Sequence, residues 1–435
     1  MSALTATRAD LSVLGADVTV KLADGTHVPY ANFDYAATAP CASAAARAVN
    51  EILPHYASVH RGAGQLSQLC TKRYEEARET LREFVGCRPD DNLIFTRNTT
   101  DALNLLAHAV PAGTTVLAFA AEHHANLLPW KRTVRLPSPS SPSGAVTAVH
   151  SALRELRRTE ADSPLLLSVT GASNVTGELW PIRELAAAAH LYGARICVDA
   201  AQLAPHRAVD IAELGVDYLV LSGHKLYAPF GAGVLAGRAD WLDAAEPYLV
   251  GGGATAHVGD ATHDVRWAAG AARHEAGTPN LLGAVSLAAV CTELALADRA
   301  EVEAEEEALT ARLRSGLAAI DGVHDLNLFG PEHPRIGVVA FVVDGVPSSR
   351  VAARLATEFG IGVRDGLFCA HPLTRRLLGA RAGRSAVGAC SDAPRGVAHC
   401  GDENIPDVTA VRASLGLGST IEQVDRLIYA VRSIA

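Results

Sequence analysis

Residues 217–238, DYLVLSGHKLYAPFGAGVLAGR, decide the fold of this chain. Two short apolar runs, DYLVLS at 217–222 and GVLAGR at 233–238, have the composition of buried strands. The polar sequence SGHK starts at the last residue of the first run. Apolar patterning does not explain a histidine and a lysine at that point, so the segment predicts a functional loop at one edge of a sheet.

Short apolar runs alternate with helical stretches along the chain before this segment. The runs that we expect to be strands are DNLIFT (91–96), TTVLAFA (114–120), LLLSVT (165–170) and ARICVDA (194–200). Between the last two, the segment 181–193, PIRELAAAAHLYG, has proline at its start and glycine at its end, as many helices do. Because strand, helix and strand follow in order, we predict an α/β fold with a mostly parallel sheet flanked by helices.

Length and a change of pattern predict two domains. A chain of 435 residues is too long for one ordinary core. Near residue 295 the pattern changes to a long acidic amphipathic helix at 297–320, followed by shorter strands and helices. We therefore predict a large domain at residues 32–294 and a smaller α+β domain made of residues 1–31 and 295–435. Residues 373–411 are rich in Gly, Ala, Arg and Ser, and we expect a long loop there.

The composition is that of an ordinary globular protein and excludes several classes of function. A net charge of −9 offers no basic surface for nucleic acid. No apolar segment is long enough to cross a membrane, and the first ten residues lack the apolar core of a signal peptide. The eight cysteines are scattered singly, with no CxxC pair. This pattern favours reduced thiols in the cytoplasm.

Polar residues that apolar patterning does not explain stand at the ends of the predicted strands. They are Asn98, Thr99, Thr100, Glu122, His123, His124, Asn174, Asp199, Gln202, Ser222, His224 and Lys225. The carboxyl ends of parallel strands meet at one edge of a sheet, so we expect these side chains to share one crevice. Each of them alone has an ordinary structural interpretation, such as a helix cap or a solvated lysine.

The chemistry of these groups is complementary. A desolvated lysine such as Lys225 forms an imine with an aldehyde, and a carboxylate such as Asp199 keeps a pyridine nitrogen protonated. Thr99 and Thr100 at a helix N-terminus suit a phosphate dianion, and the imidazole of His123 can stack on a ring. An aldehyde, a pyridine ring and a phosphate occur together in pyridoxal 5'-phosphate (PLP). We therefore predict PLP as the cofactor.

The same residues resemble a known family. Nine blocks between residue 32 and the end of the chain are similar, in order, to those of cysteine desulfurases and selenocysteine lyases. The blocks are NFDYAATAP (32–40), VHRGAGQLS (59–67), FTRNTTDALNLLA (95–107), EHHANLLPWKR (122–132), SNVTGELWPI (173–182), VDAAQLAPH (198–206), SGHKLYAPFGAGVLAG (222–237), EAGTPN (275–280) and RASL (412–415). The SGHK and EAGTPN blocks are the most specific. The resemblance implies a class V aminotransferase-like PLP enzyme of fold-type I.

The resemblance also implies roles around the cofactor ring. By it, Lys225 is the Schiff-base lysine, Asp199 binds the pyridine nitrogen and Gln202 binds the ring hydroxyl. His123 stacks on the ring and is a candidate proton carrier during catalysis.

Further implied roles concern the phosphate and the assembly. Thr100, Ser222 and His224 hold the phosphate. Thr278 of the EAGTPN block reaches the phosphate of the neighbouring subunit, which implies a homodimer with shared active sites.

The second half of the chain carries the residues expected to act on the substrate. The segment GIGVRDGLFCAHPL (360–373) is similar to the segment in which desulfurases carry their nucleophilic cysteine. Arg364 and Cys369 fall on the family's arginine and cysteine, and Arg412 falls on its substrate-carboxylate clamp, to which Asn174 also contributes. The planar fork of arginine binds a carboxylate with two hydrogen bonds. A cysteine between cationic groups can react as the thiolate.

The chain departs from the family pattern at five positions near these motifs. Leu367 and Phe368 stand where the best-matching group usually has two histidines before the cysteine. Asp365 replaces a threonine, Tyr35 replaces an asparagine and Asn98 replaces a glycine. These changes leave the PLP motifs intact and bear on the substrate.

No metal site is predicted. The long segment after the cysteine contains Cys390, His399 and Cys400, and His371 precedes it, but their spacing fits no standard zinc pattern.

The leading hypothesis is a cycle in which L-cysteine, or a related thiol or selenol amino acid, loses its sulfur or selenium and leaves as alanine. Lys225 acts as the base at Cα, and Cys369 takes the sulfur as a persulfide for a protein acceptor or a small thiol. Two alternatives stay open. One is a PLP-dependent C–S β-lyase or class V aminotransferase of a specialised pathway, and the other is a non-catalytic binding or sulfur-relay protein that keeps the fold.

Overall fold

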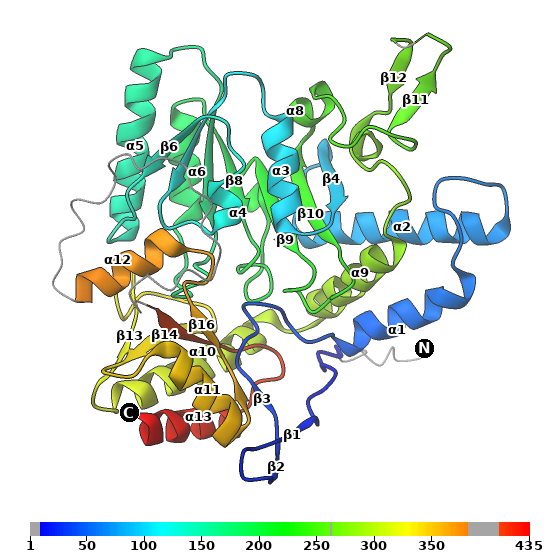
Figure 1. Cartoon of the computed structure of the whole chain (residues 1–435). Helices are drawn as coiled ribbons and strands as arrows, with labels where there is room; N and C mark the ends of the chain where they lie inside the picture. The colour runs from blue at the N-terminus through cyan, green and yellow to red at the C-terminus, as the bar shows by residue number, and fades with distance from the viewer. Residues whose placement is uncertain (1–8, 262, 382–408) are drawn as a thin grey trace, which may run out of the picture.

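The computed structural model of the chain describes residues 9–261, 263–381 and 409–435. Its centre is a seven-stranded sheet with the strand order β4-β10-β9-β8-β7-β5-β6 (Figure 1). The strands are β4 (Asp91–Thr96), β5 (Thr115–Phe119), β6 (Thr133–Leu136), β7 (Leu165–Thr170), β8 (Arg195–Asp199), β9 (Tyr218–Ser222) and β10 (Gly233–Arg238). Strands β9, β8, β7, β5 and β6 pair in parallel, while β10 is antiparallel to both of its neighbours. The predicted α/β fold with a mostly parallel sheet is confirmed.

The central strands β5, β7, β8 and β9 are buried over nearly their whole length because helices cover both faces of the sheet. Successive side chains of a strand point to opposite faces. Leu166 and Val220 accordingly belong to a core beneath α3 (Thr99–Ala109), whereas Leu167 and Leu219 belong to the core on the other face. That second core contains α5 (Pro142–Thr159) and α6 (Ile182–Leu191). Helix α6 confirms the helix predicted at 181–193, with Pro181 as its N-cap residue.

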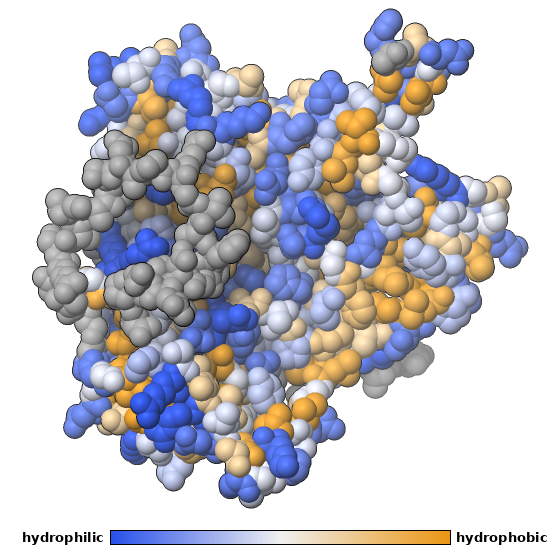
Figure 2. Space-filling view, viewed as in Figure 1, coloured by the Kyte–Doolittle hydropathy of each residue, from blue (hydrophilic) through white to orange (hydrophobic). Residues whose placement is uncertain are grey.

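Three long helices pack together beside the sheet. They are α1 (Ser43–Ile52), α2 (Gln65–Phe84) and α9 (Leu281–Leu296). Apolar side chains gather on the surface over α1 and α9 (Figure 2). Among the described residues no single helix is long and apolar enough to cross a membrane; α9 and the following α10 (Arg299–Ala318) meet that test only as a pair bent by 92°.

Several shorter elements lie between the strands and long helices described above. They are the helices α4 (His124–Leu127), α7 (Ile211–Leu214) and α8 (Ala239–Ala244), the 3-10 helices η1 (Leu53–His55) and η2 (Gly270–Arg273), and the hairpin of β11 (Thr255–Val258) with β12 (Val265–Trp267). The hairpin projects from the body of the molecule (Figure 1).

A second, antiparallel sheet has the strand order β13-β14-β17-β16. Its strands are β13 (Val323–Asp325), β14 (Val338–Val343), β16 (Arg364–Gly366) and β17 (Ala410–Ser414). Three helices share its core: α10, α11 (Ser348–Phe359) and α13 (Ile421–Ile434). Helix α10 confirms the acidic helix predicted at 297–320. The domain boundaries at residues 31/32 and 294/295 remain predictions.

The N-terminal segment contacts the second sheet, through a bridge between Asp34 and Ser414, and also the loop after β9. After the hairpin of β1 (Thr19–Lys21) with β2 (His27–Pro29), strand β3 (Ala31–Asn32) pairs in parallel with β15 (Ile361–Gly362). Beyond it, the Ala39 N–H donates to the carbonyl of His224. The expected loop at 373–411 is wrong at both ends, because α12 (His371–Arg381) begins before it and β17 starts at its last residues. Cys390, His399 and Cys400 lie outside the described residues.

Candidate active site

Twelve of the side chains predicted from the sequence line one cavity of about 310 Å³. They are Thr99, Thr100, His123, Asn174, Asp199, Gln202, Ser222, His224, Lys225, Arg364, Cys369 and Arg412. The first nine follow strands of the large sheet, and the last three belong to the second sheet or to the loop after β16. The cavity therefore lies where the carboxyl ends of the parallel strands face the second sheet.

Lys225 lies three residues after β9, in a turn closed by its N–H and the carbonyl of Ser222. Burial lowers the pKa of its amine to about 8; Asp199 opposes this fall and Arg412 adds to it. A substantial fraction of the amine is therefore uncharged near neutral pH, which is the form that attacks a carbonyl carbon.

Asp199 is the last residue of β8 and is buried. Its Oδ1 accepts the Ala201 N–H at 3.0 Å. Burial raises the pKa of this carboxyl, while the Ala201 N–H and Lys225 act in the opposite direction. A buried carboxyl of this kind suits a cationic N–H of a ligand, because the pair would offset its desolvation. Gln202 lies beside it and donates from Nε2 to the carbonyl of Ala36 at 2.7 Å.

Hydroxyl groups gather at the N-terminus of α3. The Thr99 N–H donates to Oγ of Ser222 at 2.8 Å, and the Thr99 hydroxyl lies 2.8 Å from the same oxygen. Thr100 and His224 line the cavity next to this pair. Asn98 caps the helix by accepting the Asp101 N–H at 3.0 Å. The donors and the positive end of the helix dipole suit an anion such as phosphate.

His123 is neutral over a wide pH range. Its pKa is lowered to about 3 by burial and by the nearby positive charges of Lys225, His124 and Arg412. The ring caps α4, since Nδ1 accepts the Ala125 N–H at 3.1 Å. With Nδ1 as an acceptor, the proton of the neutral ring is on Nε2.

The loop that carries Cys369 has an unusual backbone. Phe368 and Cys369 have φ angles of 54° and 51°, in the left-handed region that residues other than glycine rarely adopt. Two hydrogen bonds hold these residues. Asn174 donates from Nδ2 to the Phe368 carbonyl at 2.8 Å, and the His124 N–H donates to the Cys369 carbonyl at 2.8 Å. The loop is thereby tied to the large sheet, with Cys369 exposed at the cavity.

Arg412 is the buried cation of the site, with 3% of its surface exposed. Burial lowers its pKa to about 10, so it stays charged at neutral pH. Its Nη1 donates to the Asn174 carbonyl at 3.0 Å, and its guanidinium lies 5.2 Å from the centre of the Phe368 ring. Nη2 lies 3.2 Å from Asp34, which also binds Arg364 at 2.9 Å. Sequence reasoning missed Asp34, although it is the acidic residue of the NFDYAATAP block.

Comparisons with known proteins assign the chain to a family. The family model described as aminotransferase class-V matches residues 31–427. The chain belongs to the aminotransferase class-V family.

Individual relatives and solved structures match over nearly the whole chain. A cysteine desulfurase of Klebsiella pneumoniae (strain 342) is 34% identical over 440 residues, covering 98% of this chain and 97% of the relative. The structure of a cysteine desulfurase from Thermococcus onnurineus NA1 has a TM-score of 0.78 and 29% identity, and covers 93% of this chain and 94% of the other. A cysteine desulfurase from Escherichia coli, in an S-sulfonic acid form, has a TM-score of 0.74 at the same identity and coverage.

Three departures from the pattern of this family have different structural consequences. Tyr35 points away from the cavity, since its ring packs edge-on against Tyr227 at 6.3 Å. Asn98 replaces glycine and serves as the helix cap described above. Asn98 and Phe368 both line the cavity, where the Phe368 ring faces Arg412.

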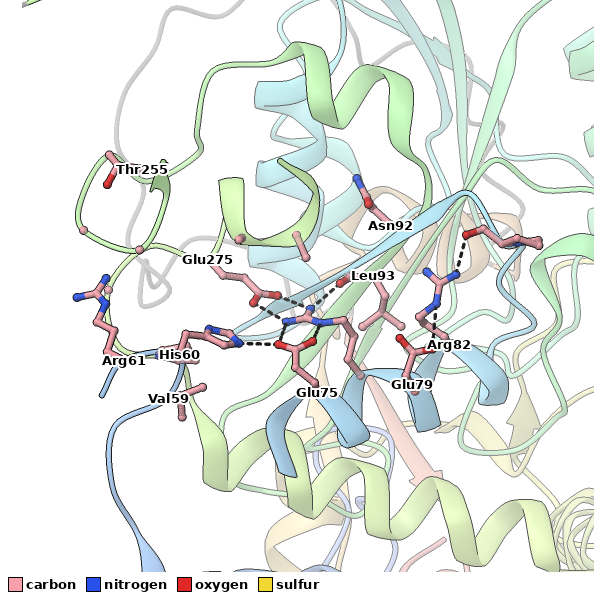
Figure 3. Close-up of a pocket in the computed structure, with 18 residues that line it drawn as sticks. Val59, His60, Arg61, Glu75, Glu79, Arg82, Asn92, Leu93, Thr255 and Glu275 are labelled. Atoms are coloured by element: carbon pink, nitrogen blue, oxygen red, sulfur yellow. Dashed lines mark hydrogen bonds and ion pairs between the residues drawn. The ribbon is translucent and has the colours of Figure 1, made fainter. Parts of the chain in front are cut away.

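A larger cavity, of about 1000 Å³, lies elsewhere in this class-V chain (Figure 3). Its main polar feature is the guanidinium of Arg78, which lies between Glu75 and Glu275 and binds Glu275 with two contacts of 2.8 Å. These groups satisfy one another, so they form a structural ion pair. Thr278, predicted to reach a neighbouring subunit, is exposed and follows Gly277, which lines this cavity.

Within the described residues, no group of three or more His, Cys, Asp or Glu side chains is placed to hold a metal ion. The six cysteines of the same ranges, including Cys369, are free thiols. His371 forms an edge-on contact with His124 at 4.4 Å between ring centres.

Proposed function

We propose that this chain is a PLP-dependent cysteine desulfurase that releases alanine from L-cysteine and keeps the sulfur on Cys369. The observation that carries the proposal is a single cavity onto which Lys225, Asp199, Arg412 and Cys369 all open. Curated relatives that match 98% of the chain are named cysteine desulfurases.

The residues of the cavity fit PLP. Lys225 would bind the aldehyde carbon covalently, and the buried carboxyl of Asp199 would face the ring nitrogen. Gln202 would lie beside the ring and His123 against its face, while Thr99, Thr100, Ser222 and His224 supply donors for the phosphate at the N-terminus of α3. When bound, PLP withdraws electrons from the α-carbon of the amino acid.

Side chains of the cavity bind the substrate carboxylate and remove the proton from Cα. Arg412 and Arg364 bind the substrate carboxylate, because guanidinium groups pair with carboxylates through two hydrogen bonds. The amine of Lys225, with its pKa near 8, takes the proton from Cα once it is free. The ring of His123 is uncharged at neutral pH and therefore does not repel the ammonium group that Lys225 becomes when it takes this proton.

Cys369 takes the sulfur. Its thiolate attacks the substrate sulfur, so that an S–S bond forms while the Cβ–S bond breaks and its electron pair stays with carbon. Protonation of that carbon gives alanine, and one cysteine thus yields one alanine and one persulfide on the enzyme. The hydrogen bonds from the Asn174 side-chain amide and the His124 N–H hold the loop of Cys369 at the cavity during this transfer.

Product analysis of the purified protein tests the proposal. We expect the absorbance of a PLP imine, alanine after addition of L-cysteine, and a 32-dalton addition on Cys369 by peptide mass spectrometry. Lys225→Ala abolishes turnover, whereas Cys369→Ala keeps the absorbance and loses sulfur transfer. Pyruvate with ammonia, or a requirement for an oxo acid, would instead identify a β-lyase or an aminotransferase.

The assembly and location are part of the proposal. A homodimer is supported by the apolar surface over α1 and α9, by Leu53, which follows α1 and is 48% exposed, and by the exposed Thr278. Mixing Lys225→Ala subunits with Thr278→Val subunits tests shared sites. If Thr278 binds the phosphate in the neighbouring site, the Thr278→Val subunit of a mixed dimer keeps its own Lys225 and receives Thr278 from the Lys225→Ala subunit. That site is then intact and regains the cofactor affinity that Thr278→Val homodimers lack. The scattered single cysteines support a cytoplasmic location, with a protein or small thiol as the sulfur acceptor.

A further inference from the structure

We propose that Asp34 reduces the net positive charge at the two carboxylate-binding arginines, Arg364 and Arg412, from two to one. This net charge favours substrates with one carboxylate over substrates with a second anionic group. This inference rests on the proposed function, because it concerns the substrate of the same cavity. Asp34 acts through Arg364 and Arg412 and is a positioning residue.

The two arginines stand at directly paired positions of neighbouring strands. Arg364 of β16 is the cross-strand partner of Arg412 of β17 in the antiparallel register. The Cβ atoms of such a pair are about 4.5–5.5 Å apart on the same face of the sheet, and like charges there repel one another. Two guanidinium groups held in this way need a counter-charge.

Asp34 supplies the counter-charge to both groups. Its Oδ2 lies 2.9 Å from Nη2 of Arg364, and its Oδ1 lies 3.2 Å from Nη2 of Arg412. Water screens the pair with Arg412 little, since the side chains of Asp34 and Arg412 are only 24% and 4% exposed. The three groups together carry one net positive charge, which matches a single carboxylate of an incoming substrate.

Backbone contacts fix the place of Asp34. Its N–H donates to Oδ1 of Asn32 at 3.0 Å, and the residue forms a parallel bridge with Ser414, two residues beyond Arg412. The Ala36 N–H donates to the Ser414 hydroxyl at 2.9 Å. The carboxylate is therefore part of the frame that holds the arginines.

Arg412 lines the cavity and has one donor that no contact with Asp34 uses. Its Nε is buried and has no hydrogen-bond partner among the described residues. A buried N–H without a partner is costly, so a substrate carboxylate that accepts from it gains binding energy. One carboxylate satisfies this donor and neutralises the net charge, so a second anionic group meets no remaining positive charge and is repelled by the carboxylate of Asp34.

Binding of two amino acids to the purified PLP-containing protein tests the inference. L-Alanine carries one carboxylate and L-aspartate carries two, and calorimetry gives the dissociation constant of each without sulfur chemistry. Asp34→Asn raises the net charge of the three groups by one. We expect the preference for alanine over aspartate to fall by about fivefold or more, from the size of a partly screened charge contact.

Three further variants make the result specific. Asp34→Glu restores the carboxylate and the preference. Asp365→Asn makes the same charge change one residue from Arg364, on the opposite face of β16, and leaves the preference unchanged. Arg364→Gln removes one positive charge and shifts the preference further toward alanine, which tests the inference even if Asp34→Asn does not fold.

Two outcomes overturn the inference. One is an equal weakening of both amino acids in Asp34→Asn, which is the result of a merely structural role. The other is an equal shift in Asp34→Asn and Asp365→Asn, which is a general charge effect. A wild-type protein that makes no alanine from L-cysteine, while the shift persists, would overturn the proposed desulfurase activity and leave the role of Asp34 standing.

Discussion

Lys225 is expected to react with aldehydes near neutral pH much faster than an ordinary lysine does. Burial lowers the pKa of its amine to about 8, against the opposing effect of Asp199. At pH 7.5 about a quarter of such an amine is uncharged, compared with about one part in a thousand at the ordinary value of 10.5. Only the uncharged amine adds to a carbonyl, so the expected advantage in rate is up to about two hundredfold.

Replacing Asp199 with asparagine removes the charge that supports the protonated amine, so the pKa of Lys225 falls further. The uncharged fraction at pH 7.5 then rises from about a quarter toward one, which is at most about a fourfold gain in rate. The assay is reductive alkylation of the cofactor-free protein by acetaldehyde and cyanoborohydride, followed by peptide mass spectrometry. Lys72, whose side chain is 72% exposed, is the internal reference.

The pattern of labelling decides whether burial controls this amine. Equal labelling of Lys225 and Lys72 at pH 7.5 would refute the reasoning. So would a labelling rate of Lys225 that rises only above pH 10, or one that falls in Asp199→Asn.

Three other side chains give predictions about stability. Glu122 is fully buried, and burial raises the pKa of its carboxyl to about 8. The stability that its protonated form contributes is therefore complete below pH 4.5 and is lost as the pH rises to 8. Glu122→Gln is expected to raise the free energy of unfolding at pH 8 by at most about 5 kcal/mol and to have little effect at pH 4.5, as measured by denaturant unfolding. Arg78→Met leaves a buried carboxylate without its partner and costs about 3–5 kcal/mol in the same assay, whereas Arg158→Met, at an exposed pair, leaves the midpoint unchanged. Asn174→Ala frees the buried Phe368 carbonyl, and we expect a loss of about 1–3 kcal/mol with faster hydrogen exchange in residues 366–371; unchanged exchange there would contradict the role given to this amide.

The residues after the parallel strands could be predicted to meet because the connection between sequence and position is local there. Lys225 follows an apolar run with the composition of a buried strand, and Asp199 ends another such run. Parallel pairing then brings the carboxyl ends of the strands to one edge, whatever the remaining structure is. The lysine and the carboxylate accordingly line the same cavity.

The use of individual groups could not be predicted in the same way. The sequence predicts that Asn174 helps to bind the substrate carboxylate, but it does not indicate that its Nδ2 also donates to the Phe368 carbonyl, 194 residues away in the chain. Tyr35 appeared to change the site and instead packs against Tyr227. The position of a polar or aromatic residue in the sequence does not show which distant residue its side chain will contact in the folded protein.

The sequence by itself determined the alternation of strands and helices along the chain, the lysine and the carboxylate at the strand ends, and the family. Repeating apolar patterns and short motifs carry that information, because each depends on neighbours within a few residues. Only the tertiary structure decided that Asp34 lies between Arg364 and Arg412, which are 330 and 378 residues away. It also decided the left-handed backbone at Phe368 and Cys369. Contacts of that kind arise when segments far apart in the chain pack together, and no local sequence pattern shows which side chains then form ion pairs.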